Sequence, residues 1–134
     1  MSRTKGTDTP VLIVGAGPVG LSLAIELSRL GTACTLIDAR DGTITTPKMN
    51  FVNVRTMEFC RRWGLTDEVR RAGHPDDFHP NVTWVTSVVG HEIARLDFPP
   101  FLEEKTRFYS PAADCLVSQL WFDPILLAYA KREQ

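Results

Sequence analysis

The chain lacks any long hydrophobic run, carries almost no net charge and holds few cysteines. A membrane-spanning helix needs about 20 consecutive apolar residues, and the polar start MSRTKGTDTP has no apolar stretch of the kind that a secretory signal requires. A net charge of −1 gives no electrostatic reason to bind nucleic acid or an anionic membrane. We therefore expect partners that are neither membranes nor nucleic acids.

Cysteine and histidine are too few, and too irregularly spaced, to indicate a disulfide framework or a metal centre. Cys34, Cys60 and Cys115 follow no ligand spacing, and the first two are expected to be small buried residues in a reducing compartment. Two histidines, two aspartates and two prolines gather at residues 74–80, which is typical of a solvated turn. The prediction is a cytoplasmic protein without a bound metal.

A glycine motif after the apolar run at residues 11–14 is the most informative feature that the chain does contain. Gly15 permits a tight turn, Gly17 lets a pyrophosphate approach bare backbone, and Gly20 allows a helix to pack closely on the strand. Unpaired N–H groups at the start of that helix favour a phosphate anion. Asp38 follows Gly20 by 18 residues, where a carboxylate can accept the hydroxyls of an adenosine ribose. The pattern predicts a dinucleotide-binding β–α–β unit, with glycines that serve packing alone as the alternative.

Helical spacing predicts two short helices after this unit. Residues 53–63 show an apolar periodicity of helical type, residues 66–72 begin with Thr66 as a cap followed by two acids, and a glycine ends each segment. In the first helix the apolar residues Met57, Cys60 and Trp63 share one face, which is expected to be buried.

The second half of the chain predicts a hairpin, a loop and a final helix. Two strand-like segments around Gly90, over residues 82–89 and 91–98, indicate an antiparallel hairpin whose second strand buries one side. Residues 101–114 are expected to be loop, and residues 116–132 are expected to be helical. The side chains expected to face inward from that helix are Leu120, Ile125, Leu127 and Ala128.

These elements describe an unfinished sheet. Only two parallel strands are expected, and a doubly wound sheet with one crossover leaves an unpaired edge. The chain also stops just after a helix, where another strand should follow. The expected fold class is α/β, a Rossmann-like β–α–β unit with an inserted antiparallel β-hairpin, incomplete as it stands. A missing C-terminal part or a second copy of the chain is the expected partner.

Four segments together resemble the single-component, FAD-dependent aromatic hydroxylases, the family of phenol and 4-hydroxybenzoate hydroxylases. The glycine motif with Asp38 fits many flavin and nicotinamide proteins, whereas the RTMEF…WGL and SQ…DPIL segments are far more particular. The four segments lie in the order that the family shows and are distributed along most of the length of residues 10–132. They are residues 15–20 with Asp38, residues 55–65, residues 82–98 and residues 118–126.

The resemblance implies a cofactor, FAD, and the residues that hold it. Residues 1–9 would be a flexible tail, and residues 10–134 would be the N-terminal portion of an FAD-binding domain. The three glycines of the motif would cradle the pyrophosphate, Asp38 would hold the adenosine ribose, and Gln119 would contact the ribityl or phosphate region. The implied cofactor-binding set is Gly15, Gly17, Pro18, Val19, Gly20, Asp38, Ala39, Arg40, Lys48 and Gln119.

One position of that set departs from the family pattern. Family members usually carry an arginine that reaches the FAD phosphates where this chain has Lys48. A lysine supplies the positive charge without the bidentate fork of a guanidinium, so a weaker or water-mediated contact is expected. For Arg40 and Gln119 a purely solvated side chain is the alternative interpretation.

The resemblance also implies a reaction in which NAD(P)H reduces FAD and O2 is used to hydroxylate a phenol-like aromatic substrate. An enzyme of this type is an FAD-dependent monooxygenase, although this stretch alone is expected to be catalytically incomplete. No residue of the chain can be assigned as a catalytic acid or base. Two alternatives stay open: an NAD(P)-binding dehydrogenase or reductase domain, and a truncated, non-catalytic remnant that acts through a partner chain.

Overall fold

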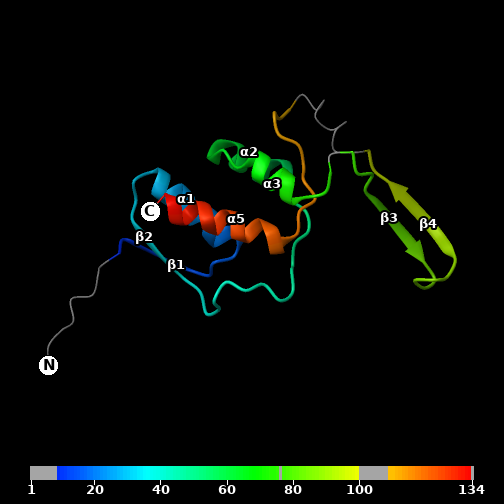
Figure 1. Ribbon diagram of the computed structural model, residues 1–134, viewed down its shortest axis with the longest axis horizontal. Helices are drawn as coiled ribbons and strands as arrows, with labels where there is room; N and C mark the ends of the chain where they lie inside the picture. Colours follow the sequence, from blue (N-terminus) through cyan, green and yellow to red (C-terminus); the bar gives the residue numbers. More distant parts are fainter. Residues whose placement is uncertain (1–8, 76, 100–108, 134) are drawn as a thin grey trace. The chain divides into compact units, whose positions relative to one another are not determined.

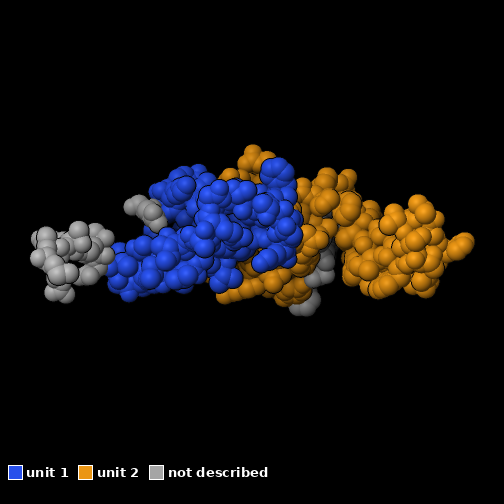
Figure 2. All heavy atoms as spheres, turned by 90° about the horizontal axis from the view of Figure 1, so that it is seen from below, with its two compact units in different colours: residues 1–48, 119–134 blue, residues 49–118 orange. Residues whose placement is uncertain are grey.

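The computed structural model describes residues 9–75, 77–99 and 109–133 (Figure 1). The flexible tail expected at residues 1–9 lies outside this part apart from Thr9, and so does most of the loop expected at residues 101–114. The chain divides into two compact units, residues 1–48 with 119–134 and residues 49–118 (Figure 2).

The first unit is built on two parallel strands and two helices. Strands β1 (Val11–Val14) and β2 (Cys34–Ile37) pair in parallel, with Val11 opposite Cys34 and Val14 opposite Ile37. Helix α1 (Pro18–Arg29) connects them, and α5 (Gln119–Arg132) runs beside α1 (Figure 1). A parallel pair needs such a crossover, and the helix fills that role here.

Helix α1 begins and ends where its sequence permits. Pro18 stands at the first helical position, where its missing N–H costs no hydrogen bond. The chain leaves the helix through Gly31, whose φ of 72° lies in the left-handed region. Leu21, Ala24 and Ile25 form the buried stripe, whereas Cys34 on β2, expected to be buried, is only half-buried.

Helix α5 differs from its sequence-based prediction in both its start and its buried face. It begins at Gln119 rather than near residue 116, because the preceding residues form an extended segment. Pro124 lies inside the helix and is exposed. The prediction that Leu120 and Ala128 point inward was wrong, since both are exposed. The buried residues, at helical spacing, are Phe122, Asp123, Leu126, Tyr129 and Ala130.

The second unit is centred on α2 (Val54–Trp63) and α3 (Thr66–Ala72). The Asn53 side chain caps α2 by accepting a hydrogen bond from the Thr56 N–H at 2.9 Å. Gly64 ends the helix with a φ of 76°. The predicted buried face of α2, formed by Met57, Cys60 and Trp63, is confirmed.

An extended segment before α5 packs against these helices. Val52 and Cys115 exchange two backbone hydrogen bonds, of 2.8 and 2.9 Å. At Gly73 a side chain would collide with this segment, because a Cβ there would lie 2.6 Å from the Leu116 carbonyl oxygen. Cys60 is fully buried, and burial raises the pKa of its thiol to about 12. Such a thiol is held in its neutral, unreactive form.

The hairpin of the second unit consists of β3 (Asn81–Val85) and β4 (Glu92–Asp97), which pair antiparallel. Both strands are shorter than the sequence pattern predicted, because residues 86–91 form the turn. Every residue of β4 is exposed within the described chain, so the expectation that this strand buries one side was wrong. An alternation of apolar and polar residues along a strand marks one face as suited to burial, but that face is buried only where another element covers it.

The described residues form a mixed α/β structure with two two-stranded sheets, which agrees with the expected α/β class at this level. No helix in that part of the chain combines the length and the apolar character needed to cross a membrane.

The buried stripe of α1 leads to a stability prediction. Ile25→Ala should lower the free energy of unfolding by about 2–5 kcal/mol, because the side chain is fully buried and its loss leaves a cavity. Leu23→Ala, on the exposed side of the same helix, is the matched control and should cost less than about 1 kcal/mol. Denaturant titration measures both values, and equal losses would contradict the assignment of the buried face.

Candidate dinucleotide-binding site

The turn between β1 and α1 brings two glycines into direct backbone contact. A Cβ on Gly20 would lie 1.9 Å from the carbonyl oxygen of Gly15, so no side chain fits there. Gly15 itself has a φ of 109°, which side-chain-bearing residues rarely adopt. Gly17 is different: it has a φ of −80°, and a Cβ there would meet nothing within 4 Å. The backbone at Gly17 is therefore open to an incoming group.

The start of α1 is free of competing side chains. Gly17 occupies the N-cap position, no side chain caps the helix, and its first turn holds no acidic residue. The N-terminal end of a helix carries partial positive charge and unpaired N–H groups, which attract phosphate. The predicted site residues Pro18 and Val19 form this end, and Val19 is 83% exposed. A shallow hollow of about 510 Å³ lies between this turn, β1 and Leu23.

Asp38 lies at the end of β2 and bonds directly to the glycine turn. Its Oδ2 atom accepts the N–H of Ala16 at 2.7 Å, and its Oδ1 atom accepts the N–H of Arg40 at 2.8 Å. These backbone donors, Ala16 first and then Arg40, hold the pKa of the carboxyl below its usual range. The side chain is therefore charged near neutral pH and points toward the turn, and its ribose-binding role stays a prediction.

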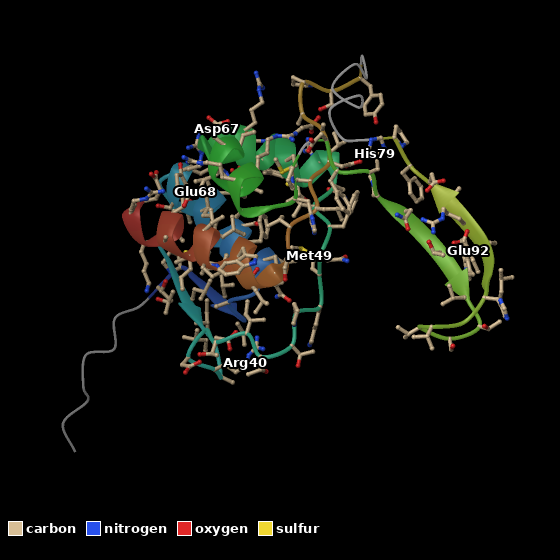
Figure 3. All side chains as sticks on the ribbon, turned by 45° about the vertical axis from the view of Figure 1, so that its right-hand side comes forward. Arg40, Met49, Asp67, Glu68, His79 and Glu92 are labelled. Atoms are coloured by element: carbon tan, nitrogen blue, oxygen red, sulfur yellow. The ribbon has the colours of Figure 1, made fainter. Side chains whose placement is uncertain are left out.

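Arg40 and Ala39 follow Asp38 on the exposed loop after β2, where Arg40 is labelled in Figure 3. The Nε atom of Arg40 lies 3.5 Å from Asp38 Oδ1, a long contact between exposed groups. A contact of this kind contributes little to stability.

Lys48 and Gln119, 71 positions apart in sequence, are joined by a hydrogen bond. The Gln119 Oε1 atom accepts the backbone N–H of Lys48 at 2.9 Å. The Gln119 Nε2 atom donates to Asp123 Oδ2, also at 2.9 Å. Asp123 was not among the site residues predicted from the sequence, although an acid four residues after a glutamine on an apolar helix could have indicated such a contact.

A larger cavity in the second unit has no counterpart in the sequence-based predictions. It encloses about 820 Å³ and is lined by Phe51, Phe78 and Phe98 together with polar residues that include Asn50 and Asp114. The His74 ring lies against that of Phe78, with 4.6 Å between the ring centroids. Its lining comes from four separate stretches of the chain, so no local motif marks it.

A bare glycine turn, an uncapped helix start and a charged acid after the second strand define a dinucleotide-binding protein. The model of the family described as FAD binding domain matches residues 8–134. The chain therefore belongs to the FAD-binding domain family, and the resemblance stated from its sequence is confirmed.

Two relatives and one solved structure illustrate the similarity. Phenol 2-monooxygenase of Pseudomonas sp. (strain EST1001) is 33% identical over 132 residues, which cover 96% of this chain and 22% of that protein. Aklavinone 12-hydroxylase RdmE of Streptomyces purpurascens is 37% identical over 131 residues, 93% of this chain and 24% of the relative. The rebeccamycin biosynthetic enzyme RebC with reduced flavin has a TM-score of 0.83 at 36% identity, over 93% of this chain and 24% of RebC. The chain thus spans about a quarter or less of the proteins it matches.

The residues present fit FAD. The glycine turn offers bare backbone and the α1 start offers positive potential for a diphosphate, while the charged Asp38 offers acceptors for a sugar. FAD supplies each of these groups.

The lowered pKa of Asp38 leads to a prediction about pH. The carboxylate stabilises the folded state at and above the ordinary aspartate pKa, and this contribution is lost as the pH falls through the lowered pKa of the folded protein. Asp38→Asn keeps only one acceptor oxygen, so it should unfold at a lower temperature than the wild type near pH 7. That difference should shrink below about pH 4. Thermal unfolding between pH 2.5 and pH 7 tests this, and a constant difference would contradict it.

Proposed function

We propose that this chain is the FAD-binding portion of an NAD(P)H-dependent monooxygenase that hydroxylates a phenol-like aromatic substrate with O2. In this proposal, residues 10–134 are the N-terminal part of a Rossmann-like FAD-binding domain that carries an inserted β-hairpin. The observation that carries the proposal is the glycine turn, bare at Gly17 and bonded to a charged Asp38, in a chain of the FAD-binding domain family.

The positions of the proposed cofactor residues and the family resemblance together assign a task to each. The backbone at Gly15, Gly17 and Gly20, continued by Pro18 and Val19, receives the diphosphate at the positive end of α1. Asp38 holds the adenosine ribose, with Ala39 and Arg40 beside it. Lys48 supplies positive charge, and Gln119 contacts the ribityl or phosphate region. When bound, the flavin supplies the redox chemistry between NAD(P)H, O2 and the substrate.

The cavity of the second unit supports an aromatic substrate. Three phenylalanine side chains give it flat apolar walls, and a few polar groups are available to orient a hydroxylated ring. Substrate pockets are commonly built in this way, with an apolar lining and few polar anchors. We assign the ring of the substrate to this cavity.

The two alternatives receive less support. Phenol 2-monooxygenase and aklavinone 12-hydroxylase are oxygenating enzymes by name, which does not favour a nicotinamide dehydrogenase. A colourless protein that binds NAD would favour the dehydrogenase. A protein that binds neither nucleotide but forms a defined complex would favour the non-catalytic remnant.

Gly17 allows FAD binding to be tested separately from folding. Gly17→Val places a side chain in open space at an ordinary φ, so thermal stability should be nearly unchanged. The FAD affinity of the full-length protein should fall about tenfold to a hundredfold, because the diphosphate loses its hydrogen bonds to backbone N–H groups. Flavin absorbance after purification and FAD titration measure the effect. Leu30→Ala, at the exposed C-terminal end of α1, is the control, and unchanged FAD content in Gly17→Val would refute the assignment.

The cavity predicts a change in substrate binding without a change in cofactor binding. Phe51→Leu or Phe98→Leu should raise the KM for the aromatic substrate about threefold to tenfold, because an aromatic contact is lost. FAD content should stay the same. Trp84→Leu removes a half-exposed aromatic ring from the hairpin outside the cavity and should leave KM unchanged. Equal effects of all three variants on KM would contradict the assignment.

A further inference from the structure

Asp123 is a buried acid to which the proposed function assigns no task. The residue is 7% exposed and lies on the inward face of α5. Its Oδ2 atom accepts the Gln119 Nε2–H, while its Oδ1 atom is buried without a hydrogen-bond partner among the described residues. A half-satisfied buried carboxyl destabilises a fold, and an apolar residue of similar size would pack at lower cost. Stability alone therefore gives no reason for an acid at this position.

The contacts of Gln119 show what the acid does. An amide presents an acceptor on one side and donors on the other, and it can turn over to exchange them. The Lys48 N–H can only donate, and a carboxylate can only accept, so these two groups together allow one orientation of the amide. In that orientation the second hydrogen of Nε2 is not used by Asp123. The carboxylate reinforces the orientation that the Lys48 N–H favours, because the reversed amide would set its oxygen against Asp123.

We infer that Asp123 is a positioning residue for the cofactor, which orients the Gln119 amide so that Gln119 presents an N–H donor to FAD. Through the same amide, Asp123 holds the backbone of Lys48, at the end of the loop that begins at Arg40. The inference rests on the proposed function, because it assigns a task to the site that Gln119 and Lys48 form there.

The environment of Asp123 is consistent with this task. Burial raises the pKa of its carboxyl, while the hydrogen bond from Gln119 and the positive charge of Arg40 act in the opposite direction. The two favourable partners are themselves members of the proposed cofactor site. The groups that favour the charged form of Asp123 are thus the groups that it would help to arrange.

The first experiment measures FAD affinity in the full-length apoprotein by flavin fluorescence titration. Asp123→Leu removes the acceptor and should weaken FAD binding about tenfold to a hundredfold. Asp123→Asn retains an acceptor oxygen and should restore binding to within about threefold of the wild type. Glu133→Leu removes an exposed acid just beyond the other end of α5 and should have no effect. Wild-type affinity in Asp123→Leu would overturn the inference.

A double-mutant cycle separates positioning from general support of the fold. If Asp123 acts through Gln119, Asp123→Leu should cause no further loss of FAD affinity in a Gln119→Ala background. If the fold-loss of FAD affinity in the double variant equals the product of the two single fold-losses, Asp123 acts independently of Gln119. That result would overturn the inference.

A variant that exchanges the amide and carboxylate groups between positions 119 and 123 remains informative even if Asp123→Leu does not fold. Gln119→Glu alone sets two carboxylates against each other and should lower thermal stability. The double variant Gln119→Glu with Asp123→Asn restores the hydrogen bond and the acceptor for Lys48, but it presents an acceptor to FAD instead of a donor. Stability should therefore recover while FAD affinity stays at least about tenfold below that of the wild type. Recovery of both would overturn the inference.

Failure of the proposed function would look different from failure of this inference. A wild-type protein that does not bind FAD refutes the proposed function, and the inference with it. A wild type that binds FAD, combined with independent effects of the two positions, refutes the inference alone.

Discussion

The hydrogen bond between the Asp38 carboxylate and the Ala16 N–H is the interaction on which the proposed site depends. It joins the end of β2 to the turn that leaves β1, in a register set by the parallel pairing of the two strands. Because the acid satisfies the N–H of Ala16, the backbone beyond it is held in place while Gly17 stays open. The carboxylate holds the turn together with the hydrogen bond from the Gly15 N–H to the Ile37 carbonyl oxygen, and it keeps a negative charge next to the turn.

The parts of the fold that were predictable from sequence are those stabilised by near neighbours. The apolar run at residues 11–14 coincides with β1, and the spacing of Met57, Cys60 and Trp63 identified the buried face of α2. Glycine marked the end of α2 because its left-handed conformation is a local property. The motif also selected Asp38 as the acid after the second strand, although its hydrogen bond to the Ala16 N–H, 22 positions away, was not predicted.

Features that depend on distant contacts could not be read from local patterns. The buried face of α5 was predicted wrongly, because the helix is amphipathic only weakly and its neighbour α1 lies about 100 positions away in sequence. The contact of Lys48 with Gln119 and the phenylalanine-lined cavity both arise from segments that meet only after folding. A buried polar atom is visible only once its surroundings are known, and sequence periodicity does not report it.

The pairing of β3 with β4 contains a one-residue irregularity, which affects how the two strands align with each other. Trp84 lies opposite Ala94, but the next pair is Val85 with Glu92, so Ile93 is an extra residue. A hairpin with both faces in solvent could slide by one residue without moving apolar side chains into or out of a core. An unpaired residue of this kind breaks that equivalence, because only one alignment accommodates it. The irregularity therefore selects a unique strand alignment where hydrophobic burial does not.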